Sequence, residues 1–85
     1  MKKKQGKLAK YLTSHFKKRC DERVGELLPR KEIERNIRNR IFTDTLFFVS
    51  KLSNTRTKYG YIFKGVLYHL IYDKLRHKLV TVIPN

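Results

Sequence analysis

Apolar residues in the first quarter of the chain recur at the spacing of an α-helix. They follow one another at three- and four-residue steps: Leu8, Tyr11, Leu12, Phe16, Cys20 and Val24. A row with this spacing lies on one side of a helix, so the pattern predicts an amphipathic helix from Lys7 to near Gly25. The lysine-rich residues 1–6 precede it, and we expect them to form a basic flexible arm.

A second helix is predicted to begin near Pro29, because proline is favoured in the first turn of a helix. Ile33, Ile37 and Ile41 repeat every four residues there and predict a buried stripe. The other side of this segment is basic and rich in amides: Arg35, Asn36, Arg38, Asn39 and Arg40.

After Ile41 the composition changes to β-branched and aromatic residues. Residues 42–52 favour a strand, although their start is also compatible with a helix, and Ser53, Asn54 and Thr55 favour a turn. Strands are then predicted over 59–63, 66–72 and 79–83, with a hairpin turn at Lys64-Gly65 and a turn over 73–77. The expected fold class is α+β: two N-terminal helices packed on a three- to four-stranded antiparallel sheet, in a single domain over 7–85.

The charge balance indicates the class of partner. The chain of 85 residues has 21 Lys and Arg against 7 Asp and Glu, a net charge of +14. A positive field of this size favours phosphate-rich partners, so nucleic acid is the expected partner, with an acidic protein or a membrane surface as weaker alternatives.

Several classes of protein are excluded by the sequence. The single Cys20 cannot form an internal disulfide, which favours a reducing, cytoplasmic location. Cys20, His15, His69 and His77 do not have the spacing of a zinc site. No export signal or membrane-spanning run is visible, and no membrane partner or cofactor is expected. All four glutamates precede residue 35, so the second half cannot supply the carboxylates of a metal-dependent nuclease, and any catalysis is expected to need no metal.

The sharpest local feature is a basic ladder on the first predicted helix. His15, Arg19 and Arg23 follow one another at four-residue steps, which places them on one side of a helix. The arginines can hold a phosphate, and a histidine can transfer a proton near neutral pH. The alternative is a solvated basic face whose charges pair with Asp21, Glu22 and Glu26.

A second cluster lies on the predicted strands. It combines basic and aromatic residues on one strand and around it, Arg56, Lys58, Tyr59, Tyr61 and Lys64, with three residues of the next strand, Tyr68, His69 and Tyr72. Such side chains can supply the base, the acid and the cation of metal-free RNA cleavage, or can stack unpaired bases without catalysis. The tyrosines are also ordinary strand residues, as is Thr81, whose hydroxyl lies among apolar neighbours and needs a partner.

Together these motifs resemble a known group of proteins. The helical H-x-x-x-R pattern, the segment Pro29-Arg30-Lys31-Glu32-Ile33-Glu34, Tyr59-Gly60 and the final Leu-Val-Thr-Val-Ile-Pro run are similar to small phage and bacterial domains of unknown function. Those domains resemble RelE- and BrnT-type toxins, compact α+β ribonucleases that need no metal. The resemblance spans about residues 13–84 and implies an RNA-cleaving or RNA-binding site on the sheet, so RNA is favoured over DNA as the partner. It assigns site positions to His15, Arg19, Arg56, Tyr59 and Thr81, and it brings in a cognate antitoxin as a partner.

Two main hypotheses follow. In the first, the chain is a metal-independent endoribonuclease of toxin type: Arg19 and Arg56 hold the phosphate, and His15, His69 or Tyr59 transfers protons, with Thr81 as a further candidate. In the second, a non-catalytic DNA- or RNA-binding or host-regulating protein contacts bases through Arg35, Arg38 and Asn39, because arginine and asparagine bond base edges. A third hypothesis, that the chain binds an acidic host protein, also fits the charge.

Overall fold

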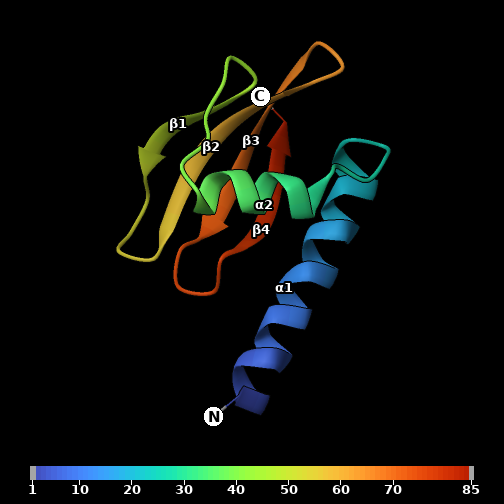
Figure 1. Ribbon diagram of the computed structural model, residues 1–85. Helices are drawn as coiled ribbons and strands as arrows, with labels where there is room; N and C mark the ends of the chain where they lie inside the picture. Colours follow the sequence, from blue (N-terminus) through green and yellow to red (C-terminus); the bar gives the residue numbers. More distant parts are fainter. Residues whose placement is uncertain (1, 85) are drawn as a thin grey trace.

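A computed structural model describes residues 2–84, with side chains described from residue 8 onward. Two helices come first, α1 (Lys2–Arg23) and α2 (Arg30–Arg38). Four strands follow, β1 (Leu46–Lys51), β2 (Arg56–Phe63), β3 (Val66–Asp73) and β4 (Lys78–Pro84). The strands form one antiparallel sheet in the order β1-β2-β3-β4, so each strand pairs with its neighbour in sequence (Figure 1). The expected α+β fold, with its helices before the sheet, is confirmed.

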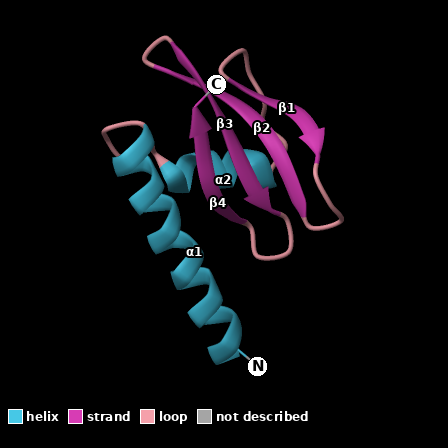
Figure 2. Cartoon of the chain, turned by 180° about the vertical axis from the view of Figure 1, so that it is seen from behind, coloured by secondary structure: helices cyan, strands magenta, loops and turns pink. Residues whose placement is uncertain are grey.

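Both helices contribute to a core on one face of the sheet. Phe16 and Cys20 of α1 and Ile33 and Ile37 of α2 are buried in the same cluster as Leu70 and other strand residues. Figure 2 shows α2 crossing behind the sheet and α1 running along β4, with the N-terminal part of α1 extending beyond the strands. The sheet therefore has a covered inner face and an open outer face.

Two polar contacts, one buried and one partly buried, hold the helices on the sheet. The Glu34 carboxylate in α2 accepts a hydrogen bond from the Leu79 backbone N–H of β4 at 2.8 Å and another from Arg30 at 2.7 Å. In α1, the Arg23 guanidinium donates to the Val82 carbonyl oxygen at 2.9 Å. Because Glu34 is buried and both its oxygens have donors, this contact also fixes where α2 sits relative to β4.

The end of α2 explains one wrong expectation. The N–H of Arg40 donates to the Ile37 carbonyl, and that of Ile41 donates to the Asn36 carbonyl at 2.8 Å. With Arg40 at φ 58°, these bonds form a Schellman motif, which ends the helix and reverses the chain. Ile41 therefore leaves the isoleucine stripe and is 51% exposed, whereas Ile33 and Ile37 are buried as expected.

Three other expectations need correction. α1 begins at Lys2 and not at Lys7, so residues 2–6 of the expected arm continue the helix. Tyr11 is 63% exposed because it falls beside the buried row of Leu12, Phe16 and Cys20 and not on it. The first strand begins at Leu46 and not at Phe42, because the chain reversing at Arg40 needs residues 41–45 to reach the sheet.

Candidate nucleic-acid interface

A cavity of about 550 Å³ opens on the inner face of the sheet, beyond the C-terminal end of α2. Its lining comes from the end of α2, the loop after it, β1, β2, β3 and the β3–β4 turn. We call it the aromatic cleft, and its lining residues are Ile37, Arg38, Arg40, Phe42, Phe48, Lys51, Thr57, Tyr59, Tyr72, Lys74 and His77. Its volume is in the range of cavities that hold small ligands, about 300–1,000 Å³.

Tyr59 is the centre of the aromatic lining. Phe42 stacks on its ring, with centroids 5.6 Å apart and planes 17° from parallel. Phe48 and Tyr72 meet the same ring edge-on, at 6.2 and 6.1 Å. Tyr59 and Tyr72 are buried, whereas Phe42 and Phe48 are 41% and 58% exposed. The two phenylalanines are therefore partly exposed to solvent while their rings contact the buried Tyr59.

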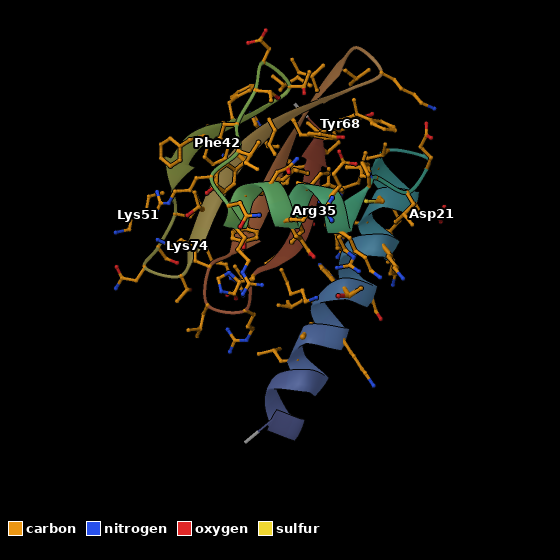
Figure 3. All side chains as sticks on the ribbon, viewed as in Figure 1. Asp21, Arg35, Phe42, Lys51, Tyr68 and Lys74 are labelled. Carbon is orange, nitrogen blue, oxygen red and sulfur yellow. The ribbon has the colours of Figure 1, made fainter. Side chains whose placement is uncertain are left out.

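Four permanent cations line the same cleft: Arg38, Arg40, Lys51 and Lys74. None of them is within ion-pair distance of a carboxylate in the described part of the chain. The described lining residues include no Asp or Glu. Figure 3 shows Lys51 and Lys74 on the same side of the molecule as Phe42, away from Asp21 on α1. The cleft thus joins apolar ring faces to charges that have no internal partner.

The cleft also holds a hydrogen-bonded pair of titratable side chains. The Tyr72 hydroxyl and His77 Nδ1 are 3.2 Å apart. Burial, together with the nearby Glu34 carboxylate, raises the pKa of Tyr72 to about 12. When Nδ1–H of His77 donates to the Tyr72 hydroxyl oxygen in this bond, Nε2 is the unprotonated ring nitrogen and can take up a proton from a ligand.

Local backbone structure brings these side chains together. The reversal at Arg40 returns the chain toward the sheet, so that Phe42 reaches Tyr59. The β1–β2 register sets Phe48 opposite Tyr59 and Lys51 opposite Thr57. His77, at φ 56°, ends the β3–β4 turn in the left-handed region, which histidine adopts more readily than most residues.

Of the residues predicted from the sequence, the cleft contains Tyr59, Tyr72 and Arg38. Arg35 is exposed on α2, as expected for its basic face. Tyr61 is half-buried and stacks on Phe63 at 6.2 Å. Neither Arg35 nor Tyr61 lines the aromatic cleft.

The basic ladder on α1 forms as predicted but is separate from the cleft. Partial burial and the positive charges of Arg19, Arg23 and Lys18 lower the pKa of His15. The Arg19 guanidinium is 2.7 Å from the Glu22 carboxylate, and Arg23 bonds the Val82 carbonyl. None of these three ladder residues lines the cleft. Arg19 therefore fits the alternative interpretation, in which the basic residues of this face pair with nearby acids, because its partner Glu22 is one of the three acids expected there.

A third group of predicted residues lies on the outer face of the sheet. Lys58, Ile71 and Thr81 are cross-strand partners in one row, and Gly60, His69 and Ile83 form the neighbouring row. The adjacent inner row contains Tyr59, Leu70 and Val82, which are buried in the core. Because side chains alternate between faces along a strand, Lys58, His69 and Thr81 point away from Tyr59 and do not share a site with it.

The two remaining basic candidates have acidic partners. Arg56 Nε is 3.1 Å from Asp73, a fully buried carboxylate that also accepts from Arg76 and from the backbone N–H groups of Leu75 and Arg76. Lys64 Nζ is 3.0 Å from Glu26. Arg56 thus helps to hold the β3–β4 turn.

Eight cleft residues were not among the predicted site residues: Ile37, Arg40, Phe42, Phe48, Lys51, Thr57, Lys74 and His77. Phe42 and Phe48 were assigned to a strand, and His77 to a turn. The sequence did contain one indication of these residues: several basic side chains lie at the ends of the predicted strands and helix, and functional residues often lie on the loops there.

Comparisons with known proteins identify no relative of this chain. No family model, no curated protein and no solved structure matches the chain. Neither α1 nor α2, over the described residues, is long and apolar enough to cross a membrane. Within the same part of the chain, no three His, Cys, Asp or Glu side chains gather as a metal site would require.

Proposed function

We propose that this protein is a metal-independent endoribonuclease that takes an unpaired stretch of RNA into the aromatic cleft. One observation carries the proposal: exposed phenylalanine rings, cations without acidic partners and a histidine meet in one cavity whose described lining has no carboxylate. The proposal keeps the partner and the cytoplasmic location expected from the charge and from the buried, unpaired Cys20.

The cleft suits single-stranded RNA better than a duplex. The bases of a duplex are already stacked on one another, whereas unpaired bases have free faces for Phe42 and Phe48. Each base stacked on an aromatic side chain contributes about 1–3 kcal/mol, and the surrounding cations attract the backbone phosphates.

Cleavage would proceed by transfer of the phosphoryl group to the neighbouring 2′-hydroxyl. A base removes the 2′-hydroxyl proton, the oxygen attacks phosphorus, a 2′,3′-cyclic phosphate forms and the bond to the 5′-oxygen breaks as that oxygen takes up a proton. We assign both proton transfers to His77, held by the hydrogen bond between its Nδ1–H and the Tyr72 hydroxyl oxygen: Nε2 takes up the 2′-hydroxyl proton and then returns it to the leaving 5′-oxygen. Arg38 and Arg40 stabilise the charged phosphorane.

The test uses labelled RNA with purified protein, in the presence and absence of a chelator. We expect cleavage that survives the chelator and yields cyclic phosphate ends. Phe48→Ala should weaken binding of 2′-O-methylated RNA, which cannot be cleaved, by about 5- to 150-fold, the equivalent of one lost stack. Val66→Ala, which removes a side chain of similar exposure outside the cleft, is the matched control. Cleavage that stops with the chelator would contradict the mechanism.

A second candidate function has its own supporting observation. Arg35 and Arg38 are exposed on α2 and, within the described residues, form no ion pair, so this face can contact nucleic acid without any catalysis. If Arg35→Gln lowers affinity as much as Phe48→Ala does and no RNA is cleaved at any enzyme concentration, binding by α2 is the better description. An acidic protein, including a cognate antitoxin, would compete with RNA for the same cations.

A further inference from the structure

A second, smaller cavity of about 280 Å³ lies between α1 and the beginning of β4. It is lined by Ala9, Lys10, Thr13 and Ser14 of α1 and by Lys78 of β4, and we call it the α1 groove. It is made of residues that the motifs above did not include.

The lining of the α1 groove has the chemistry of a phosphate site. Two ammonium groups come from different elements, and two hydroxyls lie beside them. No Asp or Glu is among its described lining residues, and neither Lys10 nor Lys78 forms an ion pair in the described part of the chain. Lysine binds phosphate as a point charge, and a hydroxyl can donate to a phosphate oxygen, so the groove favours an anion with several oxygens.

The surroundings reinforce this preference. The first acidic residue in the chain is Asp21, two residues before the end of α1, so the part of the helix around the groove has only basic and neutral residues. Charges of one sign along a groove raise the local concentration of anions. The N-terminal part of α1, which lies beyond the sheet, leaves this side of the molecule open (Figure 1).

The β3–β4 turn connects the groove to the aromatic cleft. His77 lines the cleft and Lys78, the next residue, lines the α1 groove, so their Cα atoms are only about 3.8 Å apart. Lys74 of the same turn belongs to the cleft. An RNA strand that leaves the cleft across this turn can therefore reach the α1 groove, with Lys74 lining the cleft and Lys78 lining the groove.

We propose that the α1 groove binds a backbone phosphate of the same RNA strand whose unpaired nucleotide occupies the aromatic cleft. The inference rests on the proposed function and deepens it, because it makes the substrate an extended single strand and not an isolated nucleotide.

Length dependence of binding tests the proposal. The probes are uridine monophosphate and a 2′-O-methylated oligouridylate of about ten nucleotides, within the roughly 4–16 nucleotides that small single-strand-binding domains occupy. The variant is Lys10→Gln with Lys78→Gln. We expect this variant to bind the long probe about tenfold more weakly and the mononucleotide with unchanged affinity. The slope of log affinity against log salt concentration should become shallower by about 0.7 for each phosphate contact that is lost.

Two controls separate the groove from net charge and from folding. Lys17→Gln with Lys31→Gln removes the same charge from exposed lysines outside both cavities and should leave the affinity for the long probe within about twofold. If the glutamine variant does not fold, Lys10→Arg with Lys78→Arg should retain long-probe binding, and Lys10→Gln alone should still weaken it.

The outcomes distinguish the two proposals. If Phe48→Ala weakens the long probe but Lys10→Gln with Lys78→Gln has no larger effect than the control pair, the cleft binds RNA and the groove proposal is wrong. If neither probe binds the unaltered protein, both proposals fail. If polyglutamate of matched charge competes as well as the oligouridylate, the groove recognises any polyanion and the assignment to RNA is overturned.

Discussion

Arg19 and Arg23 of α1 and the basic residues of the aromatic cleft carry the same charge but differ in what they contact. Arg19 lies against Glu22, and Arg23 bonds the Val82 carbonyl. Around the cleft, Arg38, Arg40, Lys51 and Lys74 line a cavity whose described residues include no carboxylate. Paired cations hold this protein's own structure together, whereas cations without internal partners remain available to a ligand. Net charge therefore indicates a partner class, but pairing decides where that partner can bind.

The largest expected effect is on RNA cleavage, and it should differ between substitutions of the three histidines. His77→Gln should lower RNA cleavage by about 10²- to 10⁴-fold while leaving binding of 2′-O-methylated RNA unchanged, because only proton transfer is lost. His15→Gln on α1 and His69→Gln on the outer face should cleave at the normal rate, because neither residue lines the cleft. Cleavage rates under single-turnover conditions provide the measurement. A loss of cleavage in His69→Gln but not in His77→Gln would move the site to the outer face.

Removing the partner of Arg56 should show that this pairing is structural. Asp73→Asn should lower the free energy of unfolding by about 2–3 kcal/mol, because a fully buried carboxylate with four donors is replaced by a neutral amide. Urea titration measures the change, and Asp44→Asn, at an exposed acid outside any ion pair of the described chain, is the control.

The pH dependence of Asp73→Asn has a defined sign. Burial alone would raise the pKa of Asp73, but the Arg76 backbone N–H and the Arg56 and Arg76 guanidiniums outweigh it and lower that pKa below 3.8. The carboxylate therefore stabilises the fold above pH 3.8, and this contribution is lost as the pH falls through its folded pKa. The difference between wild type and variant should shrink on acidification, and a difference that stays constant would contradict this assignment.

Two residues with positive φ allow a paired and an unpaired cation to be compared directly. Arg40 and Lys64 have φ of 58° and 51°, a conformation that costs most residues roughly 1 kcal/mol relative to glycine. Arg40→Gly and Lys64→Gly should therefore each leave stability unchanged or raise it by about 0.5–1 kcal/mol. Only Arg40→Gly should weaken RNA binding, by about tenfold, because Lys64 already pairs with Glu26. Equal losses of affinity would mean that net charge alone determines binding.

The smallest expected effect comes from releasing a paired cation. The hydrogen bond from Arg19 lowers the pKa of Glu22 and marks this carboxylate as the arginine's partner. Glu22→Gln should raise RNA affinity by less than about twofold, because the pair is exposed and outside the cleft. A gain of tenfold or more, measured by fluorescence anisotropy at low salt, would show that the α1 ladder competes with the cleft for RNA.

Much of the fold follows from local periodicity. Leu12, Phe16 and Cys20 on α1 and Ile33 and Ile37 on α2 are buried as their spacing predicts. The alternation in β2, the turn at residues 53–55 and the hairpin turn at Lys64-Gly65 also agree with the structure. These features depend on neighbours within a few residues, so a single sequence contains the information that they need.

The cleft could not be predicted in the same way. Phe42 stacks on Tyr59 only because the Schellman motif at Arg40 turns the chain, and His77 reaches the cleft only because Tyr72 lies on the inner face of β3. Its residues span positions 37–77, and none of the motifs in the sequence unites them. Conversely, Tyr59 and His69 were grouped as neighbours in one predicted cluster, but the register of β2 and β3 sets them on opposite faces.

The sequence by itself determined the α+β class, the order of elements, most of the buried residues and the positive field that favours phosphate. Tertiary structure alone decided that Arg56 and Lys64 are paired, since their contacts with Asp73 and Glu26 join residues far apart in the sequence. It also decided that the aromatic rings and the histidine of the candidate site come from a loop, three strands and a turn. The physical reason is the distance along the sequence over which contacts are made. Helix and strand periodicity depends on residues a few positions apart, whereas the charges and rings of the cleft meet only after the whole sheet has formed.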